Sequence, residues 1–342
     1  MKTYKPRNML VTGGAGFIGC NFIRYILSEY DDIQVVNLDA LTYAGSLDNL
    51  RGLADPGRYY FIHGDINDRR LVDRTLRDFE IDTVVHFAAE SHVDRSIAGP
   101  EAFVKTNIVG TFSLLEATRS FWLGDKKWDA SCCRFHHVST DEVYGSLSKD
   151  DPPFTEKTPY SPNSPYSASK AAADHLVRAY NHTYRLPVTI SNCSNNYGPY
   201  QHPEKFIPTI IQSCVKRKPI PVYGDGSNIR DWLYVLDHCK GIDLVIRRGR
   251  IGETYNIGGG NEWKNLDIVN LICTLMDQFL PENAPHSDLI AFVKDRPGHD
   301  WRYSIDARKI KEELGWKPEE DFRSGVEKTV KWYLEEKPWD RM

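Results

Sequence analysis

Two short runs in this chain carry side chains suited to hydride and proton transfer. Residues 139–145 read Ser-Thr-Asp-Glu-Val-Tyr-Gly, and residues 166–170 read Tyr-Ser-Ala-Ser-Lys. In a helix, the Tyr-x-x-x-Lys spacing places both side chains on one face, where the ammonium can stabilise the phenolate and lower the tyrosine pKa. Tyr166 is therefore predicted to be a base that takes a hydroxyl proton while hydride leaves the carbon beneath, with Lys170 as its partner.

Asp141 and Glu142 add two adjacent carboxyl groups, which a simple dehydrogenase does not need. Such a pair can divide the roles of acid and base when its surroundings push the two pKa values apart. That division suits the elimination of water. Each run alone is a weak signal, since Tyr-x-x-x-Lys matches arise by chance and an Asp-Glu dipeptide is usually a solvated turn. Their order behind a nucleotide-binding fingerprint favours the catalytic interpretation.

That fingerprint is a glycine-rich run directly after the first expected strand. Residues 13–19 read Gly-Gly-Ala-Gly-Phe-Ile-Gly and open a helix. Gly13 permits the tight turn, Gly16 lets a pyrophosphate approach the backbone, and Gly19 allows close packing of helix on sheet. The N–H groups and the dipole at the start of the helix favour phosphate groups, so we expect a bound dinucleotide.

Residues at the ends of the next strands refine this expectation. Asp39 ends the second strand, where a carboxylate accepts hydrogen bonds from ribose hydroxyls and repels a 2′-phosphate, so NAD is expected rather than NADP. Asp65 and Ile66 follow the third strand and could flank the adenine ring, although Asp65 fits a helix N-cap equally well. Residues 88–91 follow the fourth strand, where the middle of the cofactor should lie.

The elements that must position these residues alternate short apolar runs with helical segments. Strands are expected at residues 9–11, 33–38, 59–63, 83–87 and 134–138, and helices at 17–29, 71–79 and 100–118. Repeated βαβ units with nearly continuous apolar strands predict an α/β fold of the Rossmann type, a doubly wound parallel sheet covered by helices on both faces. Ligands bind at the carboxyl ends of such strands, where the motifs fall.

The pattern changes after the apolar run at residues 188–191, because prolines interrupt it and one helix near 209–216 stands among loops. Two segments are expected to return to the sheet, 233–245 and 253–257, and two to resume a smaller, irregular α/β substrate-binding lobe, 265–280 and 289–302. The Rossmann domain is expected to comprise residues 1–194, about 233–260 and 303–312. The second domain is expected to comprise residues 195–232, about 261–302 and the C-terminal helix region.

Composition limits the class of protein. The chain has 342 residues, enough for two lobes with a cleft between them. With 26% charged residues and a formal charge of -4, nothing suggests nucleic acid or an anionic membrane as a partner. No apolar run approaches the length of a membrane span, and we expect a cytoplasmic protein. The seven cysteines form no Cys-x-x-Cys pair, so reduced thiols are expected, with no metal site.

With these residues the chain resembles the extended short-chain dehydrogenase/reductases, and more narrowly the dTDP-glucose 4,6-dehydratases, over nearly its full length. The segments that carry the resemblance are residues 12–19, 88–96, 139–145, 192–199, 203–205, 230–232 and 295–299. The glycine run and the Tyr/Lys pair are shared by the whole superfamily. The Thr-Asp-Glu triplet and the Asp-Arg-Pro-Gly-His segment at 295–299 are narrower signals.

The resemblance implies a reaction in three steps. Hydride from sugar C4 reduces NAD⁺, water is lost across C5 and C6, and the same hydride returns to C6. Tyr166 would be the base at the C4 hydroxyl, Lys170 would tune it and hold the nicotinamide ribose, and Thr140 would hydrogen-bond that hydroxyl. Glu142 would remove the C5 proton, which the new ketone makes acidic, and Asp141 would protonate the departing C6 hydroxyl.

The residues above and the resemblance together give two sets of binding positions. The expected NAD-binding residues are Gly13, Gly16, Phe17, Ile18, Gly19, Asp39, Leu41, Thr42, Asp65, Ile66, Phe87, Ala88, Ala89, Thr106, Tyr166, Lys170 and Asn196. The expected nucleotide-sugar-binding residues are Ser91, Thr140, Asn195, Lys205, Phe206, Pro221, Tyr223, Arg230, Asn265, Arg296 and His299.

The chemistry of some substrate positions supports this set. Arg230 and Arg296 carry forked donors suited to a diphosphate, and Tyr223 offers a flat surface for a pyrimidine. Lys205 and His299 fit ordinary surface residues as well, and Arg230 could form a local ion pair with the residue that follows it. The superfamily commonly dimerises through the helices expected at 100–118 and 166–184, so a homodimer is expected.

Four alternatives stay open on the sequence. A UDP-hexose 4-epimerase or a nucleotide-sugar decarboxylase would keep the glycine run and the Tyr/Lys pair, but neither needs the acid pair of Asp141 and Glu142. A non-catalytic NAD sensor would be expected to have lost part of this machinery. A UDP-glucose 4,6-dehydratase is harder to separate, because thymine and uracil differ by one methyl group, worth about 1–3 kcal/mol in a hydrophobic pocket.

Overall fold

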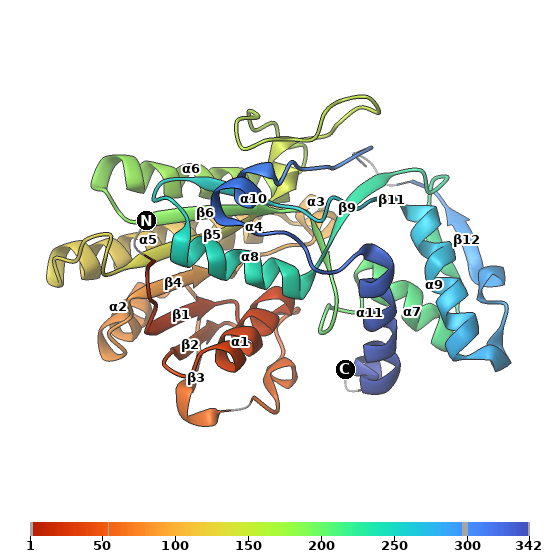
Figure 1. Cartoon of the computed structure of the whole chain (residues 1–342), viewed down its shortest axis with the longest axis horizontal. Helices are drawn as coiled ribbons and strands as arrows, with labels where there is room; N and C mark the ends of the chain where they lie inside the picture. The colour runs from red at the N-terminus through yellow and green to blue at the C-terminus, as the bar shows by residue number, and fades with distance from the viewer. Residues whose placement is uncertain (1–2, 54, 296–299, 341–342) are drawn as a thin grey trace.

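A seven-stranded parallel sheet forms the centre of the computed structural model, which describes residues 3–53, 55–295 and 300–340 (Figure 1). Its strand order is β10-β6-β5-β4-β1-β2-β3. The strands are β1 (Asn8–Thr12), β2 (Gln34–Asp39), β3 (Tyr59–His63), β4 (Thr83–His86), β5 (Arg134–Thr140), β6 (Val188–Cys193) and β10 (Thr254–Ile257). The order reverses direction between β1 and β4, the position at which doubly wound sheets bind ligands.

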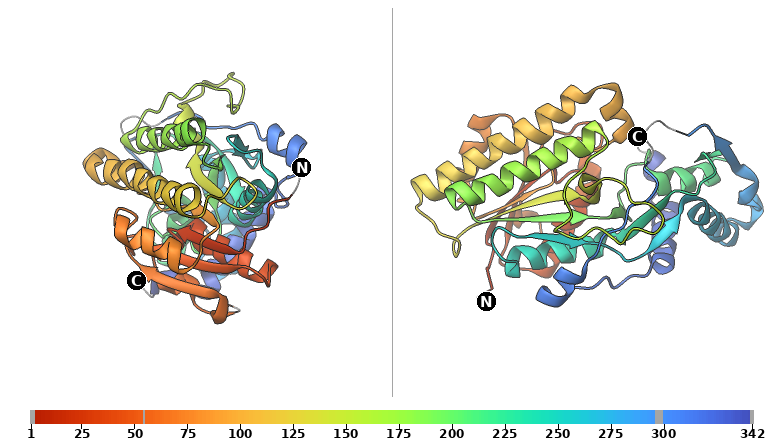
Figure 2. Two further views of the ribbon diagram at one scale, coloured as in Figure 1. Left: turned by 90° about the vertical axis from the view of Figure 1, so that its left-hand side faces the viewer. Right: turned by 90° about the horizontal axis from the view of Figure 1, so that it is seen from above.

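Helices cover both faces of this sheet, as the sequence predicted. On one face lie α1 (Phe17–Glu29), α8 (Val235–Arg248) and α10 (Arg308–Leu314), and on the other α2 (Arg69–Asp78), α5 (Thr111–Arg119) and α6 (Pro165–Tyr184). The central strands are buried on both faces; β4 and β5, for example, have no exposed residue. Figure 2 shows α5 and α6 running side by side along one face.

The helical stretch expected at 100–118 is longer and less regular. It begins with α3 (Val93–Ala98) and α4 (Pro100–Phe103), continues through the π turns η3 (Val104–Gly110) and η4 (Ser120–Asp125) on either side of α5, and ends at residue 125. The continuation follows from packing, because Phe121 and Trp122 are buried and the Trp122 indole donates to the Ile81 carbonyl at 2.7 Å.

The expectation that residues 233–245 return to the sheet is wrong, because Leu233 and Tyr234 pair with residues 196 and 197 outside the seven-stranded sheet. The strand β9 (Ile229–Tyr234) ends at residue 234, and the following residues form α8, which packs against α1. The buried positions Val235, Cys239 and Ile242 recur at helical spacing. Only β10 enters the large sheet, where it pairs with β6.

The remaining elements form a smaller α/β lobe with its own apolar cluster, on the right in Figure 1. It contains a three-stranded sheet, β11 (Glu262–Lys264), β9 and β7 (Asn195–Tyr197), and a pair of parallel strands, β8 (Ile220–Tyr223) and β12 (Ile290–Val293). Its helices are α7 (Phe206–Val215), α9 (Asn265–Phe279) and α11 (Phe322–Glu336).

Short 3-10 turns connect these elements at η1 (Leu47–Leu50), η2 (Pro56–Arg58), η5 (Asp141–Tyr144), η6 (Pro281–Asn283), η7 (His286–Leu289) and η8 (Pro338–Asp340). Among the described residues, no helix has the length and apolar character needed to span a bilayer.

Candidate active site

A cavity of about 350 Å³ lies at the carboxyl ends of the central strands. It brings together most of the residues singled out in the sequence. Those that line it are Gly13, Gly16, Phe17, Ile18, Gly19, Asp39, Thr42, Asp65, Ile66, Phe87, Ala88, Ala89, Ser91, Thr106, Thr140, Asp141, Glu142, Tyr166, Lys170, Asn195, Asn196 and Lys205.

The glycine turn at one end of this cavity has no room for side chains. Gly13 adopts a φ of +73°, and a Cβ there would lie 2.6 Å from the Ala88 nitrogen. A Cβ on Gly19 would lie 2.3 Å from the Gly13 carbonyl oxygen, which explains the close contact of α1 with the turn. No side chain caps the start of α1 and its first turn holds no acidic residue, so the helix N-terminus suits an anionic pyrophosphate.

Asp39 lies at the end of β2, buried beside this turn. Its Oδ2 accepts from the Ala15 N–H and its Oδ1 from the Leu41 N–H, both at 2.8 Å. Leu41 therefore contributes its backbone, and it does not line the cavity. Each carboxylate oxygen retains a second lone pair, which is what two ribose hydroxyls need.

Asp65 is not the cap of the next helix. The N-cap of α2 is Asp68, whose side chain accepts from the Leu71 N–H. Asp65 instead accepts from both the backbone and the side-chain nitrogen of Asn67, each at 2.9 Å, and lines the cavity. This placement favours the ligand interpretation of Asp65 over the capping one.

The end of β5 positions the two acids. Thr140 caps the 3-10 turn η5: its Oγ1 accepts from the Glu142 N–H and donates to Asp141 Oδ1, both at 3.3 Å. The turn stops at Gly145, whose φ of +98° a side chain would disfavour. Both acids therefore occupy one tight turn at the mouth of the sheet.

Their surroundings differ. Asp141 is buried, and burial raises its pKa well above the usual range, with the carboxylates of Glu142 and Asp231 adding to the effect. Its Oδ2 has no hydrogen-bond partner among the described residues. Glu142 is only half-buried. The structure thus favours a protonated Asp141 beside a more solvated Glu142, as the expected acid and base roles would require.

The helix that carries Tyr166 starts at a fixed position. Ser164 Oγ accepts from the Ser167 N–H at 3.0 Å, and Ser167 Oγ accepts from the Ser164 N–H at 3.0 Å, a reciprocal capping box. Pro165 occupies the first helical position, where its missing N–H has no cost. Tyr166 is the next residue, so this cap sets its place over the cavity.

The predicted lowering of the Tyr166 pKa by Lys170 is not found in the structure. Burial raises the pKa of Tyr166 well above its usual value, the Glu142 carboxylate adds to this, and a hydrogen bond between Tyr166 and Thr140 opposes it. The Lys170 ammonium is buried and donates to the Val138 carbonyl at 2.8 Å. Burial and the nearby negative charge therefore outweigh the ammonium at the phenol.

Two further residues that the resemblance assigns to NAD also line the cavity. Thr106 lies in the π turn η3 and lines the cavity. Asn196 is held from two sides, since its Nδ2 donates to the Ser194 carbonyl and its Oδ1 lies 2.9 Å from His238 Nδ1. Its orientation is therefore fixed by the protein.

The expected substrate residues divide into two groups. Ser91, Asn195 and Lys205 line the cavity, and Lys205 Nζ donates to the Ser91 carbonyl at 3.3 Å. Five others lie in the smaller lobe beyond the cavity lining: Phe206, Pro221, Tyr223, Arg230 and Asn265. Arg296 and His299 lie outside the described residues.

Arg230 is buried and its guanidinium holds backbone in place. It donates to the carbonyls of Ile229, Asp300 and Trp301 and lies 4.4 Å from the ring centroid of Tyr303. The following residue, Asp231, accepts from the N–H groups of two other residues, Gly259 at 3.2 Å and Asn261 at 2.7 Å. These contacts do not support the local ion pair considered from the sequence.

The sequence interpretation missed two buried polar residues near the site. Asn107 accepts from the Glu90 N–H and donates to the Glu90 carbonyl and to Ser169 Oγ, which fastens the loop after β4 to α6. Asp174 lies one helical turn after Lys170 and is fully buried. The available signal was a polar residue at a core-facing position of an amphipathic helix.

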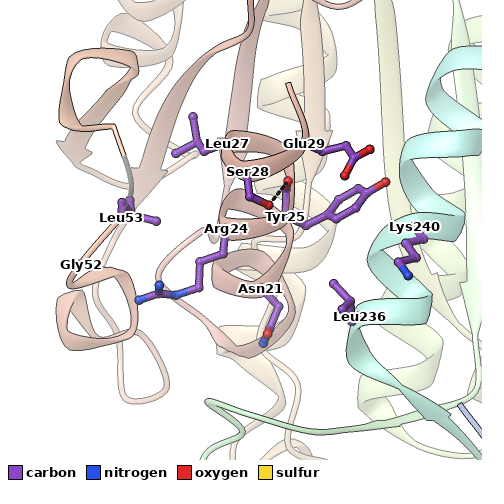
Figure 3. Close-up of a pocket in the computed structure, with 10 residues that line it drawn as sticks. All are labelled: Asn21, Arg24, Tyr25, Leu27, Ser28, Glu29, Gly52, Leu53, Leu236 and Lys240. Carbon is purple, nitrogen blue, oxygen red and sulfur yellow. Dashed lines mark hydrogen bonds between the residues drawn. The ribbon is translucent and has the colours of Figure 1, made fainter. Parts of the chain in front are cut away.

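A separate hollow of about 470 Å³ lies between α1, residues 52–53 and α8 (Figure 3). Arg24 lies at its edge and donates to the Asn49 carbonyl at 3.0 Å. None of its lining residues was singled out by the sequence, and none of them lines the cavity of the acid pair.

The Rossmann sheet, the glycine turn and a Tyr/Lys pair on one helix define the class, a short-chain dehydrogenase/reductase of the extended type. The chain matches the model of the GDP-mannose 4,6 dehydratase family over residues 10–329. It is 56% identical to the dTDP-glucose 4,6-dehydratase of Neisseria gonorrhoeae over 341 residues, 98% of each chain. The chain belongs to the dTDP-glucose 4,6-dehydratase family.

Solved structures agree in fold. The dTDP-glucose 4,6-dehydratase of Streptomyces venezuelae, solved with NAD and TYD bound, has a TM-score of 0.89 at 47% identity, covering 97% of this chain and 98% of that one. The UDP-glucose 4-epimerase of Thermotoga maritima, solved with UDP-glucose, has a TM-score of 0.83 at 26% identity, covering 96% and 99%.

Proposed function

We propose that this chain is an NAD-dependent dTDP-glucose 4,6-dehydratase, which forms dTDP-4-keto-6-deoxyglucose and water. The observation that carries the proposal is the acid pair in one cavity with Tyr166 and Lys170. An epimerase shares the Tyr/Lys pair, but its reaction gives no task to a buried Asp141 beside Glu142. The identity to a named dehydratase, 56%, also far exceeds that to the solved epimerase, 26%.

NAD fits the residues that line the cavity. The uncapped start of α1 suits the pyrophosphate, and Asp39 suits the adenosine ribose. Thr106, Asn196 and Lys170 would hold the nicotinamide half. When bound, NAD⁺ supplies a hydride acceptor whose positive ring favours a phenolate beneath it.

The first step assigned to this chain is proton removal at the C4 hydroxyl. Tyr166 Oη would take that proton as hydride leaves C4, and Thr140 would orient the same hydroxyl. The Lys170 ammonium would stabilise the phenolate through its charge. Two electrons leave C4 with the hydride, so a ketone remains at C4.

The second step is the loss of water across C5 and C6. The ketone makes the C5 proton acidic, and Glu142 would remove it. Asp141, held in its acid form by burial, would give its proton to the departing C6 hydroxyl. The hydride then returns to C6 and a proton to C5, so the cofactor ends as it began.

The smaller lobe would hold the nucleotide part of the substrate. We propose a division into a Rossmann domain and this nucleotide-sugar-binding domain, supported by their separate apolar clusters. Lys205 would reach the sugar or diphosphate from the cavity wall, and Arg230 would act by shaping the site, since it holds backbone carbonyls. Phe206, Pro221, Tyr223 and Asn265 would line the part farther from the acids.

We also propose a homodimer and a cytoplasmic location. Four large apolar side chains are 45–49% exposed on adjoining helical segments: Val104, Val109, Phe112 and Tyr184. A second copy of this face would cover them in a helical contact. The seven cysteines are all free thiols, which fits a reducing compartment.

Incubation with dTDP-glucose tests the activity. The expected product is a 4-keto sugar nucleotide lighter by one water in mass spectrometry. A product of unchanged mass would instead favour epimerisation, and loss of carbon dioxide from a uronic acid substrate would favour decarboxylation. Purified protein that carries NAD but turns over no nucleotide hexose would support the sensor. Rates with UDP-glucose in parallel measure the preference between thymine and uracil.

A further inference from the structure

A buried carboxylate beneath the cavity connects the two halves of the catalytic machinery. Asp174 lies on α6 one turn after Lys170 and is fully buried. Its Oδ2 accepts from Ser139 Oγ at 3.0 Å and from Tyr160 Oη at 2.8 Å. Because Ser139 directly precedes Thr140, this carboxylate ties the helix of the Tyr/Lys pair to the strand end of the acid pair.

The other carboxylate oxygen and the Lys170 ammonium lie near the same nitrogen of one imidazole. Asp174 Oδ1 lies 3.2 Å from His137 Nε2, and that nitrogen lies 3.5 Å from Lys170 Nζ. Burial and the Lys170 ammonium lower the pKa of His137 to about 4, so this imidazole is neutral at working pH. Asp174 and the Lys170 ammonium therefore both lie close to one nitrogen of a neutral ring, and Asp174 balances the lysine charge.

Most of the groups around Lys170 and Asp174 are neutral, so Asp174 is the main negative charge that balances the Lys170 ammonium. The titratable and charged groups packed around the pair are His86 on β4, His137 on β5, Asp141, Glu142 and Tyr144 on η5, Tyr160 in the preceding loop, Tyr166 and Arg178 on α6, and Cys193 on β6. Burial keeps the two histidines, the tyrosines and the thiol neutral. Arg178 donates to Tyr160 Oη at 2.6 Å.

An ammonium taken out of water loses its proton unless a negative charge compensates it. Burial lowers the pKa of Lys170, and Asp174 opposes that shift. Burial also favours the acid form of Asp174, but the interaction with His137 and the charge of Lys170 outweigh it, so the pKa of Asp174 lies below its usual value. The two charged forms support each other.

We propose that Asp174 is a positioning residue for the oxidation at C4, which keeps Lys170 protonated beneath Tyr166 and fixes the end of β5 against α6. The inference rests on the proposed dehydratase activity. It concerns a residue that does not line the cavity and acts through Lys170 and Ser139.

The test is Asp174→Asn, which keeps the size of the side chain and an acceptor oxygen but removes the charge. In single turnovers with dTDP-glucose, NADH formation should fall off at a lower pH, with the alkaline limb displaced by about 1–3 pH units. A second readout needs no turnover: the ¹³Cε resonance of Lys170, assigned by its loss in Lys170→Met, should titrate at a correspondingly lower pH.

Tyr160→Phe is the matched control, because it removes a hydrogen bond to the same carboxylate and keeps the charge. It should lower thermal stability without moving the alkaline limb. Asp174→Glu restores the charge and should return the limb most of the way. The proposal is overturned if Asp174→Asn leaves both the alkaline limb and the Lys170 titration unchanged. It is also overturned if Tyr160→Phe displaces the alkaline limb as far as Asp174→Asn does.

If Asp174→Asn does not fold, comparing it with a double variant still decides the question. If charge balance is the reason, the double variant Lys170→Met/Asp174→Asn should fold and be more stable than Asp174→Asn alone. A double variant that is no more stable would show a purely structural role. If the wild-type protein does not turn over dTDP-glucose, the proposed function fails, while the Lys170 titration still tests the role of Asp174.

Discussion

Asp141 and Glu142 are neighbours in the chain, but only Asp141 is fully buried. Burial and two neighbouring carboxylates favour its acid form, whereas Glu142 keeps access to solvent. Two adjacent carboxyl groups can therefore take different roles, one as acid and one as base, because one is buried more deeply in the turn than the other.

Glu142→Gln should separate oxidation from elimination. Because Tyr166 and Lys170 remain, dTDP-glucose should still reduce bound NAD⁺, seen as near-ultraviolet absorbance, while solvent deuterium no longer enters C5. Tyr166→Phe should instead suppress the reduction itself by about 10²–10⁴-fold, the usual contribution of a general base. Deuterium incorporation at the wild-type rate in Glu142→Gln would exclude it as the C5 base.

Asp141→Asn should stabilise the protein at high pH. The pKa of Asp141 is raised in the folded state, so folding binds a proton, and stability falls as pH rises from the unfolded pKa to the folded one. The variant lacks this loss, so its gain over wild type should grow by about 1.4 kcal/mol for each pH unit between those two pKa values. Urea unfolding at pH 5 and pH 8 measures it; a difference that does not grow with pH contradicts the buried acid.

At the scale of elements, α6 matters because a local signal fixes its first turn. Ser164 and Ser167 cap each other, and the next position after Pro165 is Tyr166. The sequence analysis did not use this signal, which consists of Ser164 just before the helix and Ser167 in its first turn, and which sets the starting residue more sharply than apolar periodicity does.

Ser164→Ala should remove one side of this capping box. The expected loss is about 1 kcal/mol of unfolding free energy, measured in urea, together with slower NAD⁺ reduction as Tyr166 loses its fixed position. Ser148→Ala, on an exposed loop, provides a control that removes a serine hydroxyl elsewhere. Equal effects of the two variants would count against a special role of the cap.

At the scale of the whole molecule, the helical face with Val104, Val109, Phe112 and Tyr184 should join two copies of the chain. Phe112→Asp would place a charge in that contact and should shift the protein from dimer to monomer in analytical ultracentrifugation. Phe292→Asp, at the similarly exposed strand β12, is the matched control and should leave the dimer intact. A wild-type protein that sediments only as the 39.2 kDa chain at micromolar concentration contradicts the dimer.

The sequence by itself determined the fold class and the position of the glycine turn, and it indicated the residue types of the candidate active site. Strand alternation with helices and the spacing of Gly13, Tyr166 and Lys170 are local patterns, and local patterns survive without tertiary contacts. The sequence also predicted the bounds of α1 correctly, because a glycine turn precedes it and its apolar stripe is regular.

Only the tertiary structure decided the electrostatics. The high pKa of Asp141, the raised pKa of Tyr166 and the contact of Asp174 with His137 depend on burial and on residues distant in the chain. The assignment of residues 235–248 to a helix against α1, and the use of Arg230 to hold backbone carbonyls, likewise depend on packing partners. The spacing of residues along a chain does not show which side chains lose contact with water. The residue types of the site could therefore be predicted, but the shifts of their pKa values could not.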